Sequence, residues 1–234
     1  MQTALHIERA LKKVGTAKRA ASSARFFKTG KGEYGQGDIF VGVTVPEQRK
    51  LAKEYATLPQ GEIAKLLKRR IHECRLTALI LLIGQYKSGD EAARTKIARF
   101  YLARTKYVNS WDLVDVSAGA ILGTHLLTRD RRILYRLARS KNIWERRIAI
   151  IATLAFIKAG DVHDTLLLAE LLLADTHDLM HKAVGWMLRE VGKQARPALV
   201  CFLKINAAHM PRTALRYAIE HFGEAERKKF LRAT

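Results

Sequence analysis

The chain has 234 residues, and its 42 lysines and arginines against 22 aspartates and glutamates give a formal net charge of +20. This excess favours a polyanionic partner, although a soluble basic protein without a specific ligand could share it. With 48% hydrophobic residues the chain can build a core, yet no stretch approaches the roughly 20 uncharged residues that a membrane span needs.

The N-terminus and the two cysteines bear on cellular location. His6 and Glu8 come before any apolar run could form, so we expect no secretory signal. Cys74 and Cys201 lie far apart within apolar helical patterns, which is typical of buried reduced thiols. We therefore expect a cytoplasmic protein.

A glycine-rich stretch, residues 29–42, precedes the β-branched residues around Val43. We predict an ordered loop that leads into a helix at Pro46. Gly30, Gly32 and Gly35 match the dinucleotide-binding fingerprint in form, but no strand precedes them and no βαβ unit surrounds them. We interpret these glycines as turn residues, next to Lys28 and Lys31, which could contact a phosphate.

Beyond this loop, apolar residues recur at helical spacing, as in 63–83 and 148–155, and strand signals are almost absent. Segments 73–78, 144–149, 179–184 and 211–216 each open a helix with charge and then become apolar. The last three begin about 30 to 37 residues apart, a spacing typical of stacked helix pairs. We predict an all-α chain, a single domain over residues 1–234 built as an α-solenoid, with a concave basic groove; an irregular helical bundle is the alternative.

His177 and His181 stand four residues apart, as two metal ligands on one helix would. No third ligand follows at a recognisable spacing, so we interpret them as satisfied or exposed histidines. We expect no metal site and no cofactor.

The three tryptophans, Trp111, Trp144 and Trp186, lie at or near starts of these repeat helices. Core packing is the ordinary interpretation of each ring. Trp111 and Trp186, however, have polar neighbours, which favours rings that face a groove.

Asp115 follows Trp111 by four residues, so a helix would place the two on one face. Asn109 or Ser110 can cap that helix, and Asp112 then complements its dipole. Asp115 lies one turn further and would repel phosphates. A physical reason for it is stabilisation of positive charge, either on a cationic damaged base or on an oxocarbenium-like sugar.

Three strings, 109–115, 142–150 and 182–190, resemble the AlkD-like DNA alkylation-repair glycosylases, and the resemblance runs from about residue 25 to residue 222. It implies a HEAT-like α-solenoid whose concave face holds duplex DNA. It further implies excision of N3- and N7-alkylated purines, such as 3-methyladenine and 7-methylguanine, in base excision repair and without the tight base pocket that most base-processing enzymes use.

The same resemblance assigns roles by position. Trp111 and Trp186 match two rings that contact the deoxyribose and backbone at the lesion, Asp115 matches the catalytic carboxylate, and Arg147 matches an arginine of the catalytic cleft. Further contacts to the DNA backbone are expected from Arg189, Arg49 and Thr44, and from the basic helix starts at Arg146 and Lys182. The expected partner is alkylated double-stranded DNA, bound by a monomer.

The loop at residues 29–38 is longer than in the family, so contacts near Phe26, Phe27 and Thr44 are expected to differ. Two other functions fit parts of the sequence. A non-catalytic helical-repeat protein that binds branched or distorted DNA would use the same groove. An adaptor for acidic proteins would explain the charge but would leave Trp111, Trp186 and Asp115 unconnected.

Overall fold

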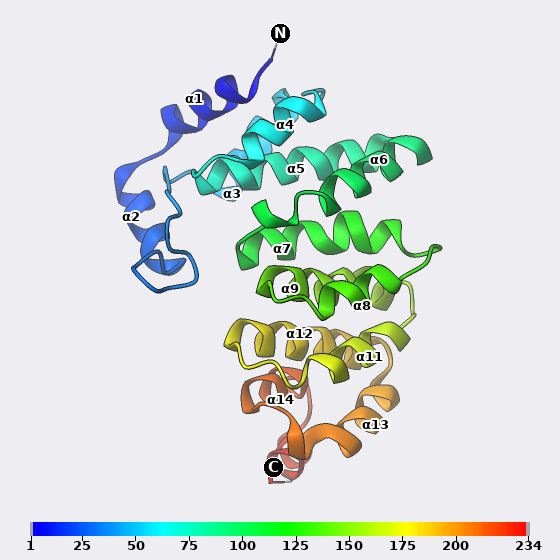
Figure 1. Ribbon diagram of the computed structural model, residues 1–234. Helices are drawn as coiled ribbons and strands as arrows, with labels where there is room; N and C mark the ends of the chain where they lie inside the picture. The colour runs from blue at the N-terminus through cyan, green and yellow to red at the C-terminus, as the bar shows by residue number, and fades with distance from the viewer. Residues whose placement is uncertain (1, 233–234) are drawn as a thin grey trace. The chain divides into compact units, whose positions relative to one another are not determined.

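The computed structural model describes residues 2–232, and helices account for most of them (Figure 1). Within these residues the only β-pairing is an isolated parallel bridge between Ile39 and Ile71. The predicted all-α class is therefore confirmed. The chain divides into two compact units, Met1–Ser117 and Ala118–Thr234; the predicted concave basic groove and the single domain stay predictions.

The first unit is built from seven α-helices and one short 3-10 turn: α1 (Ala4–Val14), α2 (Ala17–Phe26), α3 (Val45–Glu54), α4 (Gln60–Leu67), α5 (His72–Ser88), α6 (Glu91–Leu102), η1 (Thr105–Tyr107) and α7 (Trp111–Ser117).

Helix α5 forms the centre of this unit, because α1, α3, α4, α6 and α7 all pack against it. Leu79 and Leu82 on α5 are fully buried, as the apolar spacing predicts. Cys74 is also buried, and burial raises the pKa of its thiol to about 12. This cysteine is therefore a neutral part of the core at physiological pH.

The glycine-rich segment between α2 and α3 is an ordered loop, as predicted, and α3 begins at Val45 with Pro46 in its first turn. Thr44 caps α3 together with Glu47 in a reciprocal capping box. Gly42 adopts a φ of +80°, and a Cβ there would lie 2.3 Å from the Thr16 carbonyl oxygen. Only glycine fits this close approach of the loop to α2.

A buried carboxylate, that of Glu73 on α5, holds the end of this loop. Its oxygens accept the backbone N–H groups of Val41 at 3.0 Å, Gly42 at 2.7 Å and Val43 at 3.4 Å. Because Glu73 is only 2% exposed, no solvent can replace these bonds without opening the unit. The side chain therefore fixes the route of the loop into α3.

The substitution Glu73→Gln removes the charge and turns an N–H₂ group toward these backbone donors. We expect the free energy of unfolding to fall by about 1–3 kcal/mol, the cost of leaving a buried polar group unpaired. Denaturant titration measures it, with Glu54→Gln, the same change at an exposed position of α3, as the matched control. Equal stability of the two variants would contradict the role given to Glu73.

The second unit begins with a π-helical turn and continues through α-helices: η2 (Ala118–Gly123), α8 (Arg132–Ala138), α9 (Ile143–Ala152), α10 (Leu154–Lys158), α11 (His163–Leu172), α12 (Asp178–Gln194), α13 (Arg196–Asn206), the 3-10 turn η3 (Ala207–His209), α14 (Arg212–Ala218) and α15 (Glu224–Arg232).

Helix α12 is central to this unit and packs against α9, α10, α11, α13 and α14. Met187, Leu188 and Val191 on α12 are fully buried. At Gly185 the backbone of α14 comes so close that a Cβ would lie 2.5 Å from the Ala214 carbonyl oxygen. The absence of a side chain there allows the two helices to pack closely.

Two details of the second unit refine the sequence-based expectations. Trp144 is 8% exposed and belongs to the core. Cys201 is exposed, contrary to the expectation of a buried thiol. The buried face of α13 is formed by Leu199, Phe202 and Leu203, and Cys201 lies roughly 200° around the helix from both leucines.

Among residues 2–232, no helix combines the length and the apolar character that crossing a bilayer requires.

Candidate functional site

Helix α7 carries Trp111 and Asp115 on its partly exposed face. The helix begins at Trp111 itself, and its residues Leu113 and Val114 are buried in the first unit. Trp111 and Asp115 are half-buried. The prediction that a ring and a carboxylate share one face of a helix is therefore confirmed.

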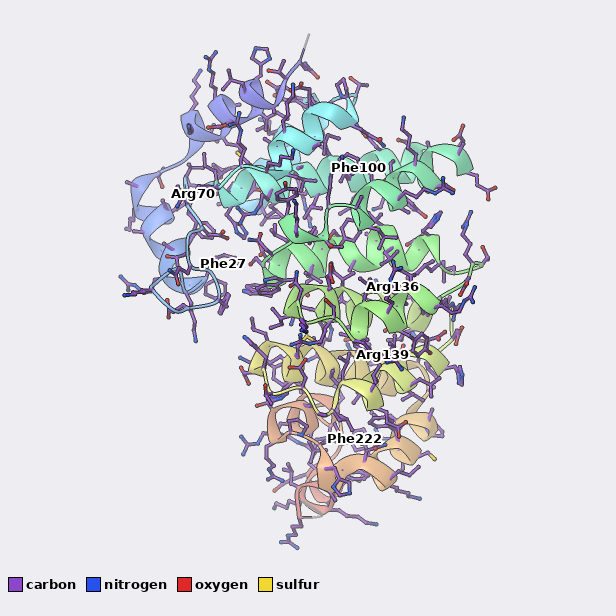
Figure 2. All side chains as sticks on the ribbon, viewed as in Figure 1. Phe27, Arg70, Phe100, Arg136, Arg139 and Phe222 are labelled. Carbon is purple, nitrogen blue, oxygen red and sulfur yellow. The ribbon has the colours of Figure 1, made fainter. Side chains whose placement is uncertain are left out.

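The indole of Trp111 rests on aromatic side chains from the end of α2 and the loop that follows it. Phe27 stacks on it with ring centroids 5.3 Å apart and planes inclined by 14°, and Phe26 meets it edge-on at 5.8 Å. Phe40 stacks on Phe27 at 5.0 Å. Phe27 is labelled in Figure 2, at the end of α2. These contacts fix the plane of the indole.

Phe26 and Phe27 also contact each other, with ring centroids 5.2 Å apart. The half-buried indole of Trp111 is therefore held in one orientation, with Asp115 one helical turn further along α7.

Asp115 lies near the buried hydroxyl of Tyr101. Burial, and the negative charge of Asp115, raise the pKa of Tyr101, while a hydrogen bond with Ser117 at 3.0 Å opposes the rise. Tyr101 consequently stays a neutral phenol at physiological pH. A carboxylate beside a π surface, in a protein of net charge +20, is chemically suited to a cationic centre.

Asp112 does more than complement the dipole of α7. Its Oδ2 lies 2.7 Å from Nε2 of His72, and Nδ1 of His72 lies 2.9 Å from Oδ2 of Asp38. Arg75 donates to the same Asp38 oxygen at 2.6 Å. The start of α7 is thus tied to α5 and to the glycine-rich loop through buried charged groups.

Sequence patterns did not predict this network. Asp38 and Asp112 lie 34 and 40 residues from His72, so no helical or strand period connects them. The one available signal was the density of polar residues, His72, Glu73 and Arg75, at the start of the long and largely buried helix α5. Such a cluster must find partners when it is buried.

In the second unit, Trp186 and Arg189 belong to α12. Nε1 of Trp186 donates to Oε1 of Glu190 at 3.1 Å, and Arg189 pairs with Glu220 of the segment after α14. Trp186 is half-buried. This indole is therefore oriented by a hydrogen bond within its own helix.

The cations predicted to bind phosphates in this unit already have partners. Arg147 on α9 is 4% exposed and donates to the Leu179 carbonyl oxygen at 2.5 Å. Arg146 pairs with Asp175 at 2.6 Å, and Lys182 pairs with Asp178 at 2.7 Å. Their roles in binding DNA stay predictions.

Of the predicted phosphate contacts in the first unit, Arg49 and Thr44 are both exposed at the start of α3. Oγ1 of Thr44 donates to Glu47 at 2.7 Å, whereas Arg49 forms no ion pair with any residue in the described range. The expectation that Asp115 and Trp186 act on the same substrate stays a prediction.

The histidine pair of α12 agrees with its interpretation as satisfied side chains. Nδ1 of His177 accepts the backbone N–H of Leu179 at 3.1 Å, and Nε2 of His181 lies 2.5 Å from the Asp175 carbonyl oxygen. Across residues 2–232 no group of three or more His, Cys, Asp or Glu side chains is arranged to hold a metal ion.

Replacing Phe27 by alanine removes the ring between Trp111 and Phe40. We expect the free energy of unfolding to fall by about 1–3 kcal/mol, because the change deletes a half-buried ring and two stacked pairs. Phe26→Ala, at a ring that is 66% exposed, should cost far less. Both values come from denaturant titration, and a loss from Phe26→Ala as large as that from Phe27→Ala would contradict the stacking arrangement.

Comparison with known proteins identifies relatives of the chain. A family described as DNA alkylation repair enzyme matches residues 7–222. No curated protein matches the chain in sequence. A solved structure described as a predicted DNA alkylation repair enzyme from Enterococcus faecalis has the same fold: it is 18% identical, with a TM-score of 0.71, over 90% of this chain and 97% of that chain.

Proposed function

The chain belongs to the DNA alkylation repair enzyme family, and we propose that it is a DNA glycosylase that excises N3- and N7-alkylated purines from duplex DNA. The observation that carries this proposal is the pairing of Trp111 and Asp115 on the partly exposed face of α7. An acid placed there in so basic a protein is a disadvantage for plain DNA binding. It becomes useful if positive charge appears during a reaction.

The proposed reaction is hydrolysis of the bond between the sugar and the base. A purine alkylated at N3 or N7 carries a positive charge and leaves as a neutral base, so no general acid is needed. Asp115 stabilises the oxocarbenium-like sugar and orients the attacking water, and Trp111 offers its π face to the same charge. The products are the free base and an abasic site.

Binding to duplex DNA follows from the charge of the protein. Arg49 is exposed and without an ion pair in the described structure, so it can contact a phosphate directly. Lys182 and Arg189 are paired with exposed acids, and surface pairs of this kind contribute only about 0–1 kcal/mol. A phosphate can therefore replace Asp178 or Glu220 at little cost.

Arg146 and Arg147 are held more firmly within the second unit. Their guanidinium groups bind Asp175 and the Leu179 carbonyl, respectively. We propose that both arginines support the α9 face on which DNA lies, and that they also contact phosphates there. Trp186, also half-buried, supplies a second ring for the DNA backbone. The protein acts as a monomer in this proposal.

Asp115→Asn tests the reaction directly. Release of 3-methyladenine and 7-methylguanine from N-methylated duplex DNA, under single-turnover conditions, should fall on the order of 10²-fold or more, since an electrostatic contact to the transition state is lost. Duplex affinity, measured by fluorescence anisotropy, should stay the same or increase. Asp130→Asn, at an acid that is exposed and paired only with Arg132, is the control and should release base as the unmodified protein does.

A non-catalytic binder of distorted DNA would give a different result. It would bind duplex or branched DNA and release no base above a buffer control, and Asp115→Asn would leave this behaviour unchanged. A joint loss of binding and folding stability in Asp115→Asn would instead make the residue structural.

Arg49→Gln tests the phosphate contact. We expect weaker binding of all duplexes, whatever their sequence, and a salt dependence of log K reduced by about 1. Arg227→Gln, on the exposed side of α15, makes the same change of charge at a cation without an assigned role. An unchanged salt slope for Arg49→Gln, or an equal reduction in both variants, would remove Arg49 from the binding surface.

A further inference from the structure

Four charged side chains, two of them buried and two half-buried, form a cluster in the first unit, apart from the residues to which the proposed reaction assigns a role. Asp38 comes from the glycine-rich loop, His72 and Arg75 from the first turn of α5, and Asp112 from the first turn of α7. His72 is 2% exposed and Arg75 is 4% exposed. With His72 protonated, the cluster contains two positive and two negative groups and is neutral as a whole.

The two carboxylates favour a proton on both ring nitrogens of His72, whose Nδ1 also lies 3.4 Å from Nη2 of Arg75. Each nitrogen faces a carboxylate oxygen, with Nδ1 at 2.9 Å from Asp38 and Nε2 at 2.7 Å from Asp112. A neutral imidazole has one N–H and could donate to only one of them. Two ionised carboxylates therefore select the imidazolium.

The surroundings of His72 favour the same charged form. Burial lowers the pKa of His72, but the hydrogen bonds to Asp112 and Asp38 outweigh burial and the nearby charge of Arg75, so the pKa is raised. Asp38, Asp112 and Arg75 are the charged groups that act on the ring, and the aromatic rings of Phe27 and Phe40 lie against it.

A second connection runs through the rings. Phe40 stacks on His72 at 4.6 Å, Phe27 lies 4.8 Å from it, and Phe27 in turn stacks on Trp111. His72 thus reaches Trp111 by two routes. One is the hydrogen bond to Asp112, the residue next to Trp111 in the chain, and the other is the aromatic stack.

We propose that His72 is a positioning residue, held between Asp38 and Asp112 and stacked on Phe40. It docks the glycine-rich loop on the first turn of α7 and so fixes the Trp111 ring and the Asp115 carboxylate. The consequence for catalysis rests on the proposed function. The structural part, that His72 sets the position of Trp111, does not depend on the proposed function.

Two changes should release the loop from α7: a neutral side chain at position 72, and a rise in pH that removes the charge of His72. A neutral side chain at this position leaves the carboxylates of Asp38 and Asp112 without their charged donor. Because the pKa of His72 is raised above 6.5, the stabilisation is fully present at pH values below 6.5 and is lost only as the pH rises through the higher folded-state pKa. Below pH 6.5 the unmodified protein therefore keeps the loop docked.

The test uses Trp111 as the only tryptophan. In a Trp144→Phe, Trp186→Phe background, the indole N–H resonance and the fluorescence of Trp111 report its surroundings without any need for activity. We expect His72→Gln to shift both signals, and the parent to keep them constant from pH 5.5 to 6.5. His163→Gln, at an exposed histidine of α11, is the control and should match the parent.

Activity gives the second readout, measured with all three tryptophans present. In His72→Gln the single-turnover rate of base release should fall at least tenfold, with duplex affinity changed less than twofold, because the reacting groups move while the phosphate contacts stay. Asp112→Asn, which removes the charge but keeps an oxygen acceptor, replaces His72→Gln if that variant loses its helical circular dichroism, and the same shifts are expected.

The outcomes are separable. Unshifted Trp111 signals in folded His72→Gln and Asp112→Asn would overturn the positioning role, whatever the enzyme activity. If the unmodified protein releases no base, the proposed function fails, but the Trp111 signals still decide the role of His72. Equal losses of rate and affinity would reduce His72 to a general contributor to stability.

Discussion

The first turn of α5 is the constraint on which the candidate site depends. Its polar residues, His72, Glu73 and Arg75, are all buried and all bind the segment between α2 and α3. Buried charges are tolerated only when they are paired, and removal of one partner of a buried pair typically costs about 3–5 kcal/mol. The loop therefore has one stable place, and the aromatic side chains that it carries support Trp111.

This arrangement explains how a glycine-rich loop can be part of a site that needs a fixed geometry. Glycines such as Gly42 permit the tight route, and on their own they would leave the loop free to move. The Glu73 carboxylate and the Asp38–His72 bond remove that freedom at its C-terminal end. The loop that we expect to be longer than in the family is thus also the segment that is docked beside Trp111.

Charge has two functions in the account proposed for this protein. The excess of lysine and arginine attracts the DNA, and most of the cations assigned to phosphates in the second unit are held by acids until DNA arrives. The negative charge of Asp115 has the second function. It faces the positive charge that develops on the sugar as the alkylated base leaves.

Sequence patterns predicted what depends on local periodicity. The all-α class, the helix at Pro46 and the shared face of Trp111 and Asp115 follow from spacings of a few residues. The His72 network and the Phe27 stack could not be predicted, since their partners lie tens of residues apart. Asp112 shows the difference: its position in a first turn suggested a dipole role, and only the structure reveals its bond to His72. Cys201 shows it too, because an apolar window does not say which face of a helix is buried.

The most direct test of the central claim is to identify what leaves the DNA. Duplex DNA that contains 7-methylguanine is incubated with the protein, and the soluble fraction and the DNA are analysed separately by mass spectrometry. A glycosylase gives free 7-methylguanine, with its methyl group intact, and an equal amount of abasic sites. Methylated guanine that stays in the DNA, or unmethylated guanine in its place, would contradict the account.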